Sequence, residues 1–177
     1  MSDDIKTKAL FLDRDGIINT DHGYVYKIDD FEFVEGIFDL VKLFSDAGYL
    51  IFVVTNQSGI GRGYYTVEDF HTLTAWMTEK FYAQGIAIEE VCYCPHTPDD
   101  QCTCRKPATG MIAQALKHCD IDLSQSWMIG DKCSDIELAG NSGIGRSIFI
   151  GNDETVNADY TFNSIKACLN KIPELLH

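Results

Sequence analysis

The sequence lacks long apolar runs. No segment approaches the roughly 18 consecutive apolar residues of a membrane-spanning helix. The amino terminus, MSDDIKTKALFLDRDG, contains no apolar segment of signal-peptide length. We therefore expect a cytoplasmic protein that does not insert into a membrane. Thiols stay reduced in that compartment, so the cysteines are not expected to form disulfides.

Basic residues are also scarce. The chain has 14 Lys and Arg residues against 27 Asp and Glu residues, which gives a formal net charge of −13. Sequence-independent binding of nucleic acid requires clustered basic surface, so this composition argues against nucleic acid as a partner. An anionic substrate would have to be attracted by a local positive field, because the charge of the whole protein repels it.

Repeats, low-complexity tracts and long linkers are absent from the sequence as well. A length of 177 residues suits one compact domain, 1–177, with its own core. The hydrophobic fraction of 45% and the charged fraction of 23% are ordinary for a globular protein. We expect this domain to be a monomer.

Short β-rich segments alternate with amphipathic helical segments along the chain. Several of the strand-like segments are almost wholly apolar, as expected when helices cover both faces of a sheet. The alternation predicts an α/β fold: a doubly wound parallel sheet in a three-layer sandwich, without a large cap domain. Two segments, 19–33 and the cysteine-rich loop at about 92–107, are predicted to be irregular. Strands are predicted at 8–13, 50–55, 88–93, 127–131 and 147–150, and helices from Glu35, Thr66, Thr109, Ser134 and Ser164.

Three of the predicted strands end in polar motifs: FLDRDG, VVTNQSG and MIGDKCSD. Each motif has an ordinary structural explanation when taken alone. Asp13 and Asp15 suit an Asp-Gly turn, residues 55–58 suit a polar turn, and Asp131 or Asp135 suits a helix N-cap. In a parallel sheet, however, the three motifs would meet at one edge, where ligands bind in folds of this kind.

Carboxylates gathered at one sheet edge would repel each other unless a cation lay among them. Oxygen ligands of this kind suit magnesium, which keeps several waters and recruits substrate phosphate. A carboxylate in such a site can also be a nucleophile that forms an aspartyl-phosphate. The three motifs together therefore predict a magnesium-dependent site for phosphate chemistry.

The stretch CYCPHTPDDQCTCRKP, residues 92–107, gathers four cysteines and one histidine. The pattern C-x-H-x5-C-x-C offers four soft ligands, the number that a tetrahedral structural zinc site uses. Reduced cysteines packed as small apolar side chains, and a redox dithiol, are the alternatives. Two thiols in a loop as polar as TPDDQCTC are poor candidates for packing, so we favour zinc.

The motifs DRDG, TNQSG, RKP and GDKCSD, in this order, resemble the four motifs of the haloacid-dehalogenase phosphatase superfamily. Longer stretches narrow the resemblance. FLDRDGIINTDHGYV, FEFVEG, VVTNQSGIGRGYYT, CPH and CTCRKP are similar to the heptose bisphosphate phosphatases of that superfamily. The resemblance implies a magnesium-dependent phosphatase that removes the 7-phosphate of a heptose 1,7-bisphosphate, a step towards nucleotide-activated heptose for surface glycans such as lipopolysaccharide.

The resemblance also implies catalytic roles. Asp13 would be the nucleophile, and Asp15 the general acid that protonates the leaving oxygen and later the base that activates water. Thr55 and Lys106 would hold the phosphoryl oxygens. Magnesium would be bound by the side chains of Asp13 and Asp131 and by the backbone carbonyl of Asp15. Asp135 remains a capping or supporting residue without a defined role.

The resemblance further implies a sugar pocket and a zinc site. Cys94, His96, Cys102 and Cys104 would be the zinc ligands, and Cys92 would pack in the core. Since four protein ligands leave no open position, this zinc would be structural, and it would fix Arg105 and Lys106 beside the acidic site. Substrate-binding side chains are expected at Asn19, Thr20, Asp21, His22, Asn56, Gln57, Ser58, Arg105 and Lys132.

Two features leave alternatives open. Only five residues separate His96 from Cys102, a spacing that is similar to the histidinol-phosphate phosphatase domain. That activity is the alternative within the superfamily. More remote alternatives are a zinc-containing binding module and a phospho-accepting signalling domain, which would use a strand-end aspartate and magnesium without Asp15 as an acid–base.

Overall fold

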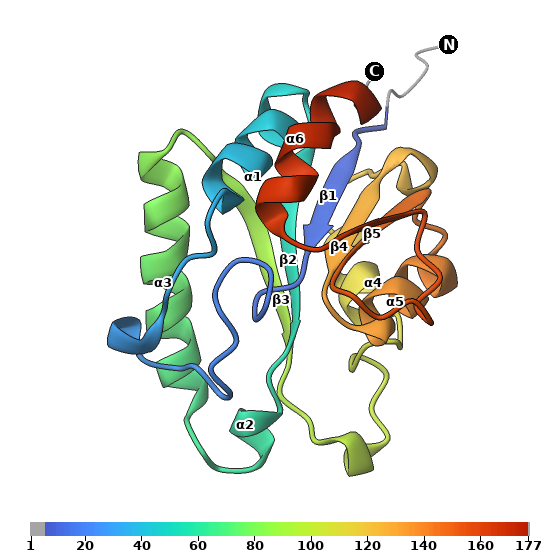
Figure 1. Ribbon diagram of the computed structural model, residues 1–177. Helices are drawn as coiled ribbons and strands as arrows, with labels where there is room; N and C mark the ends of the chain where they lie inside the picture. The colour runs from blue at the N-terminus through green and yellow to red at the C-terminus, as the bar shows by residue number, and fades with distance from the viewer. Residues whose placement is uncertain (1–5, 177) are drawn as a thin grey trace.

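The computed structural model describes residues 6–176, and its central feature is a six-stranded sheet in the order β3-β2-β1-β4-β5-β6 (Figure 1). Every pair of neighbouring strands is parallel. The strands are β1 (Ala9–Leu12), β2 (Leu50–Asn56), β3 (Ile88–Cys94), β4 (Trp127–Gly130), β5 (Arg146–Ile150) and β6 (Tyr160–Phe162).

Helices cover both faces of the sheet, so the predicted three-layer sandwich is confirmed. The core on one face is closed by α1, α3 and α6, and the core on the other face by α4 and α5 (Figure 1). The helices are α1 (Ile37–Asp46), α2 (Ser58–Gly61), α3 (Val67–Ala83), α4 (Gly110–Leu116), α5 (Cys133–Ser142) and α6 (Ile165–Leu175).

The apolar sequence of β1 follows from this double burial. Leu10 and Leu12 lie in the core under α1, α3 and α6, whereas Ala9 and Phe11 lie in the core under α4 and α5. Successive side chains of a strand point to opposite faces, so both sets of alternate positions must be apolar. Each of these four residues is fully buried.

The order in which the strands follow one another across the sheet changes direction at β1. It adds β2 and β3 on one side, then crosses to add β4, β5 and β6 on the other. Ligands bind outside the carboxyl ends of the strands at such a switch point. In Figure 1 the arrow of β1 points to this edge, where α2 and the loop after β3 lie.

The structure departs from the predicted elements in small ways. The helix expected from Glu35 begins at Ile37, since Gly36 has a φ of 86°, a left-handed conformation that suits glycine and lies outside a helix. The short helix α2 and the edge strand β6 are not predicted from the sequence. Three 3₁₀ turns occur as well: Ile28–Asp30, Pro98–Asp100 and Leu123–Gln125.

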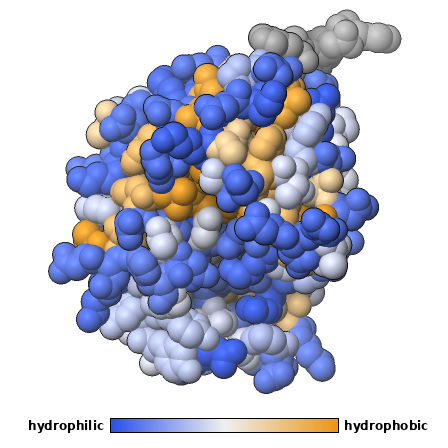
Figure 2. All heavy atoms as spheres, viewed as in Figure 1, coloured by the Kyte–Doolittle hydropathy of each residue, from blue (hydrophilic) through white to orange (hydrophobic). Residues whose placement is uncertain are grey.

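Hydrophilic side chains dominate the face shown in Figure 2, and apolar side chains gather in the upper half of the view, over α1 and α6. Most of this face is therefore polar, and its apolar area lies over these two helices. Within residues 6–176, no helix combines the length and the apolar character needed to span a membrane.

Candidate active site

A cavity of about 390 Å³ opens at the carboxyl ends of the central strands. The ends of β1, β2 and β4 contribute to it, together with the loop after β1 and the loop that precedes α4. Residues far apart in the sequence therefore meet there. The cavity is lined by Asp13, Asp15, Asp21, Gly23, Tyr24, Asn56, Gln57, Ser58, Tyr65, Arg105, Lys106, Lys132 and Ser134.

Asp13 lies where β1 ends and reaches the cavity. Its backbone N–H donates to the carbonyl of Ile129 in β4 at 3.1 Å. Its Oδ1 accepts from Lys106 Nζ at 2.9 Å and from the backbone N–H of Arg14 at 2.8 Å. Burial by itself would raise the pKa of Asp13, but the Lys106 ammonium outweighs it and holds the pKa below its usual value. The carboxylate is therefore ionised and oriented.

Lys106 is buried among oxygen acceptors. Its Nζ lies 2.9 Å from Asp13 Oδ1, 2.7 Å from Asp135 Oδ1 and 2.9 Å from the carbonyl oxygen of Val54. Burial would lower the pKa of Lys106, but the two carboxylates raise it above its ordinary value. The site therefore contains a fixed positive charge beside Asp13.

Asp135 has two structural roles, which answers the question that the sequence leaves open. Its Oδ2 accepts from the backbone N–H of Lys132, the N-cap residue, at 3.1 Å and so caps the start of α5. Its Oδ1 forms the ion pair with Lys106. The carboxylate is fully buried, and a Cβ at Gly130 would lie 2.2 Å from the Asp135 Cβ. Glycine at the end of β4 therefore makes room for it.

Asp131 has features that fit a cation. Its Oδ1 is inaccessible to solvent and has no hydrogen-bond partner among residues 6–176. Carboxylate oxygens of Asp13, Asp131 and Asp135 all lie within 4.8 Å of one another. Burial, together with the negative charge of Asp13, raises the pKa of Asp131 to about 8. A divalent cation would relieve this repulsion, so the residues present fit the magnesium ion that the sequence predicts.

Gly16 explains the glycine of the DRDG motif. It has a φ of +90°, and a Cβ at this position would lie 2.0 Å from Asp131 Oδ2. A side chain would be strained there and would also displace a candidate metal ligand. The loop after β1 can therefore approach Asp131 only because residue 16 has no side chain.

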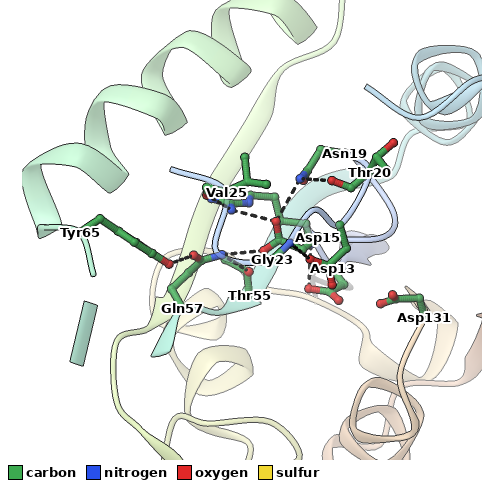
Figure 3. Close-up of polar contacts among 12 residues, drawn as sticks. Asp13, Asp15, Asn19, Thr20, Gly23, Val25, Thr55, Gln57, Tyr65 and Asp131 are labelled. Carbon is green, nitrogen blue, oxygen red and sulfur yellow. Dashed lines mark hydrogen bonds and ion pairs between the residues drawn. The ribbon is translucent and has the colours of Figure 1, made fainter. Parts of the chain in front are cut away.

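Asp15 is held by three side-chain donors, of which Figure 3 labels Asn19 and Gln57. Its Oδ1 accepts from Arg14 Nη2 at 2.9 Å and from Asn19 Nδ2 at 3.0 Å. Its Oδ2 accepts from Gln57 Nε2 at 3.0 Å. The Arg14 guanidinium is buried and also donates to the carbonyl of Val25 at 2.7 Å. Sequence reasoning missed Arg14, although a cation directly after a buried strand is a signal that could have found it.

The loop after β2 positions its neighbours. The Asn56 side chain accepts from the backbone N–H of Lys106 at 3.0 Å and donates to the carbonyl of Lys106 at 3.4 Å. The hydroxyl of Thr55 is buried and accepts from Gln57 Nε2 at 2.8 Å. Asn56 therefore joins the loop that carries Lys106 to the end of β2.

The structure brings six of the nine predicted substrate-binding residues to the cavity. They are Asp21, Asn56, Gln57, Ser58, Arg105 and Lys132. The other three lie elsewhere: Asn19 is buried beneath Asp15, Thr20 does not line the cavity, and His22 lies 3.2 Å from Glu32 in a separate hollow. Gly23, Tyr24, Tyr65 and Ser134 line the cavity but are not predicted. Two of them are tyrosines in short motifs that contain glycine: Tyr24 in HGYVY and Tyr65, the second tyrosine of RGYYT.

Two further cations, Arg105 and Lys132, line the cavity. Arg105 Nη1 is inaccessible to solvent and has no hydrogen-bond partner within the described part of the chain. Lys132 Nζ lies 3.6 Å from Asp21 Oδ2, with its side chain about half exposed. Both side chains can reach an anionic group in the cavity, which supplies the local positive field that a chain of net charge −13 needs.

The four residues expected to bind zinc form one cluster. Ligand atoms of Cys94, His96, Cys102 and Cys104 all lie within 4.8 Å of one another. Cys94 Sγ lies 3.6 Å from Cys102 Sγ and 3.5 Å from His96 Nδ1, close to the roughly 3.7 Å edge of a tetrahedron with Zn–S bonds of about 2.3 Å. Cys104 Sγ lies closer, 2.8 Å from Cys94 Sγ, which is still far beyond a disulfide bond.

One of the three thiols of this cluster ionises readily, whereas burial raises the pKa of the other two, Cys94 and Cys104. Burial would raise the pKa of Cys102, but nearby backbone N–H groups of Arg105 and Cys104 lower it to about 6. A thiolate is the form that binds zinc. Cys92 is fully buried in the core with Met111 and Ile112 and lies outside the cluster. The cluster could therefore hold a zinc ion directly before Arg105 and Lys106.

Comparison with known proteins agrees with the sequence motifs. The profile of the HAD-hydrolase-like family matches residues 103–172. The D-glycero-alpha-D-manno-heptose-1,7-bisphosphate 7-phosphatase of Campylobacter jejuni is 46% identical over 172 residues, which cover 96% of this chain and 98% of the relative. The D-glycero-beta-D-manno-heptose-1,7-bisphosphate 7-phosphatase of Helicobacter pylori is 47% identical over 81% of this chain and 83% of its own length.

A solved structure shares the whole fold. The D,D-heptose 1,7-bisphosphate phosphatase of B. bronchiseptica, in complex with magnesium and phosphate, superposes with a TM-score of 0.83 at 25% identity. The match covers 95% of this chain and 99% of that one. The magnesium in this relative supports a magnesium site here, and the resemblance to the superfamily is confirmed. The chain belongs to the heptose 1,7-bisphosphate 7-phosphatase family of the haloacid-dehalogenase-like phosphatases.

Proposed function

We propose that this chain hydrolyses the 7-phosphate of D-glycero-D-manno-heptose 1,7-bisphosphate with the help of magnesium. The observation that carries the proposal is that Asp13 and Lys106 line one cavity, with Asp131 beside Asp13 and two further cations in the lining. The names of the relatives supply the substrate. They also favour a heptose bisphosphate over histidinol phosphate, the alternative suggested by the short spacing between His96 and Cys102.

In the first step an Asp13 carboxylate oxygen attacks phosphorus, and the bond between phosphorus and the sugar oxygen breaks. Asp15, protonated at this stage, gives its proton to the leaving oxygen. Lys106 and Thr55 hold the phosphoryl oxygens, where negative charge is concentrated in the transition state. The product of this step is an aspartyl-phosphate on Asp13 and a heptose 1-phosphate.

In the second step a water molecule attacks the phosphorus of the aspartyl-phosphate. The Asp15 carboxylate takes a proton from that water, phosphate leaves, and Asp13 is restored. A magnesium ion bound by Asp13, Asp131 and the carbonyl of Asp15 would neutralise the charge that the carboxylates and the phosphoryl group bring together. This role agrees with the unpartnered oxygen of Asp131.

We infer a structural zinc ion at Cys94, His96, Cys102 and Cys104. The loop between β3 and α4 contains only a 3₁₀ turn, Pro98–Asp100, and otherwise lacks regular structure. A zinc ion there would crosslink the loop and hold Arg105 and Lys106 at the cavity. We also infer a monomeric, single-domain enzyme of the cytoplasm; all seven cysteines are free, which suits a reducing compartment.

A direct assay tests the proposed function. The purified chain, given magnesium and heptose 1,7-bisphosphate, should release one phosphate per substrate and leave heptose 1-phosphate, which phosphorus NMR identifies. Asp13→Asn should abolish turnover, because an amide is a poor nucleophile. Activity of that variant at the wild-type rate would rule out the covalent mechanism, and release of the 1-phosphate would contradict the assigned position.

A further inference from the structure

The Gln57 amide uses all of its polar atoms within the protein. Its Nε2 donates to Asp15 Oδ2 at 3.0 Å and to Thr55 Oγ1 at 2.8 Å. Its Oε1 accepts from the hydroxyl of Tyr65 (Figure 3). The side chain is 2% exposed. One amide thus joins the two residues to which the mechanism assigns proton transfer and phosphoryl binding.

The orientation of this amide is determined by its partners. Nε2 must face Asp15, since an amide oxygen turned towards the carboxylate would repel it. The donor at the other end is the hydroxyl of Tyr65. Burial raises the pKa of Tyr65 to about 12, so this hydroxyl stays protonated near neutral pH and remains available as a donor.

The Tyr65 ring is itself held firmly. It is 5% exposed and stacks on Tyr26 with ring centroids 5.2 Å apart and an interplanar angle of 9°. A Cβ at Gly59 would lie 2.2 Å from Tyr65 Cε1, so only glycine leaves room for the ring. The hydroxyl therefore approaches Gln57 from a fixed position.

These hydrogen bonds leave the reactive atoms free. Asp15 Oδ1 already accepts from Arg14 and Asn19, whereas among residues 6–176 Oδ2 accepts from Gln57 alone. Oδ2 is therefore the oxygen with room for the proton that the leaving group needs. Thr55 accepts from Gln57 through Oγ1, so its own hydroxyl hydrogen remains available for a phosphoryl oxygen.

We propose that Gln57, anchored on Thr55, is a positioning residue for Asp15, and that the Tyr65 hydroxyl fixes the Gln57 amide in the orientation this requires. The inference rests on the proposed function, because it assumes that Asp15 is the general acid. It assigns Gln57 to the catalytic groups and not to the sugar. It also gives a role to Tyr65, whose hydroxyl acts on the reaction only through Gln57.

The test compares substrates whose leaving groups differ in their need for a proton. The leaving groups of heptose 1,7-bisphosphate and glycerol 3-phosphate are alkoxides, which need a proton from a general acid. The leaving group of p-nitrophenyl phosphate is a stable phenolate, which does not. The value of kcat/KM reports the steps up to departure of the leaving group. Asp15→Asn is the reference: it should lower kcat/KM for the alkyl esters by about 10²–10⁴-fold and affect the aryl ester much less.

Tyr65→Phe should also lower kcat/KM for the alkyl esters more than for the aryl ester, but by less than Asp15→Asn does. We expect kcat/KM for the alkyl esters to fall about 10-fold, a fraction of a general acid's usual contribution, through kcat with KM unchanged. The value for p-nitrophenyl phosphate should stay within about twofold of wild type. Tyr82→Phe removes the same hydroxyl from an exposed side chain on α3 and should change neither value.

A double-mutant cycle tests whether Tyr65 acts through Gln57. Gln57→Leu should show the same preference for the aryl ester, and adding Tyr65→Phe to it should cause no further loss. Equal losses on alkyl and aryl esters, a loss confined to KM, no loss, or additive losses in the double variant would each overturn the proposal. Gln57→Leu provides the same comparison if Tyr65→Phe does not fold. A wild-type chain without phosphatase activity would instead refute the proposed function.

Discussion

The ammonium of Lys106 lies between two buried carboxylates, 2.9 Å from Asp13 and 2.7 Å from Asp135. One ammonium thereby stabilises two carboxylates that are buried away from water. The two acids have different tasks, since Asp13 faces the cavity and Asp135 caps α5. A buried charge that loses its partner is costly, so this arrangement links the fold directly to the reactive group.

Asp135→Ala should destabilise the fold more than it affects substrate affinity. It removes one of the two carboxylates beside Lys106 and the side-chain cap of α5, and breaking a buried pair costs about 3–5 kcal/mol. Urea unfolding should show a loss of about that size. Glu137→Ala, an exposed acid on the same helix, should change stability by less than about 0.5 kcal/mol. Similar unfolding midpoints for the two variants would contradict this account.

Arg105→Ala should weaken recognition of the second phosphate. Arg105 Nη1 lacks a partner among the described residues, and a guanidinium fork suits a phosphate. A charge-assisted contact is worth about 1.5–3 kcal/mol, so kcat/KM for the bisphosphate should fall about 10- to 150-fold, mainly through KM. Steady-state kinetics on a bisphosphate and a monophosphate measures the difference.

The monophosphate result decides the role of Arg105. A monophosphate lacks the distal group, so its kcat/KM should fall much less in Arg105→Ala. Lys117→Ala, which removes an exposed cation next to α4, should leave both values unchanged. Equal losses on the bisphosphate and the monophosphate would show that Arg105 does not read the second phosphate.

Single residues differ in how far the sequence predicts them. The meeting of Asp13 and Asp131 follows from strand-end motifs in a parallel sheet, because topology brings such positions together. Lys106 lies in the long loop after β3, and only the resemblance to the superfamily predicts its place at the site. The buried contacts of Arg14 and the double role of Asp135 cannot be read in that way. They depend on which way a side chain turns within a loop, and this is decided by packing against distant segments.

Helices, strands and loops also differ in how far the sequence predicts them. Strands buried on both faces are visible as apolar runs, and all five predicted strands are present. The edge strand β6 has only three residues, none of them fully buried, so its sequence carries little pattern. The segment 19–33 was expected to bring four successive side chains, residues 19–22, to the sugar pocket, but its turns bring only Asp21. Irregular backbone has no periodicity from which such directions could be predicted.

The loop between β3 and α4 is the element that should depend most on metal. Cys102→Ser should remove one of four zinc ligands, so metal analysis should find well below one zinc per chain. Activity should fall as well, because Arg105 and Lys106 follow the cluster directly. Cys119→Ser, outside the cluster, should keep the zinc content of wild type. Full zinc occupancy in Cys102→Ser would show that the ligand set is wrong.

At the scale of the whole molecule, the acidic composition and the order of the strands both place negative charge at the ends of β1 and β4. Crossing from one half of the sheet to the other brings the ends of β1 and β4 together, and both ends carry aspartates. The fold thus gathers carboxylates that repel one another, in a chain whose net charge is already −13. Part of the folding free energy is therefore offset at the site until a cation binds there.

Magnesium should accordingly stabilise the folded chain as a whole. A ligand that binds only the folded state at 100 times its Kd adds about 2.7 kcal/mol. At about 2–4 °C per kcal/mol for a chain of this size, the thermal midpoint should rise by roughly 5–10 °C. The measurement is thermal unfolding with and without magnesium, in buffer free of chelator so that any zinc stays bound.

Asp131→Asn should raise the thermal midpoint without magnesium and should remove most of the stabilisation that magnesium gives. Without magnesium this variant should unfold at a higher temperature than wild type, because it removes a buried carboxylate that faces Asp13. Asp131 Oδ1 accepts no hydrogen bond among residues 6–176, and Lys132 Nζ lies 3.9 Å from it. With magnesium it should gain little, because a ligand has been lost. Glu79→Gln, which neutralises an exposed acid on α3, should keep the full magnesium response. If Asp131→Asn responds to magnesium as wild type does, the ion does not bind among these carboxylates.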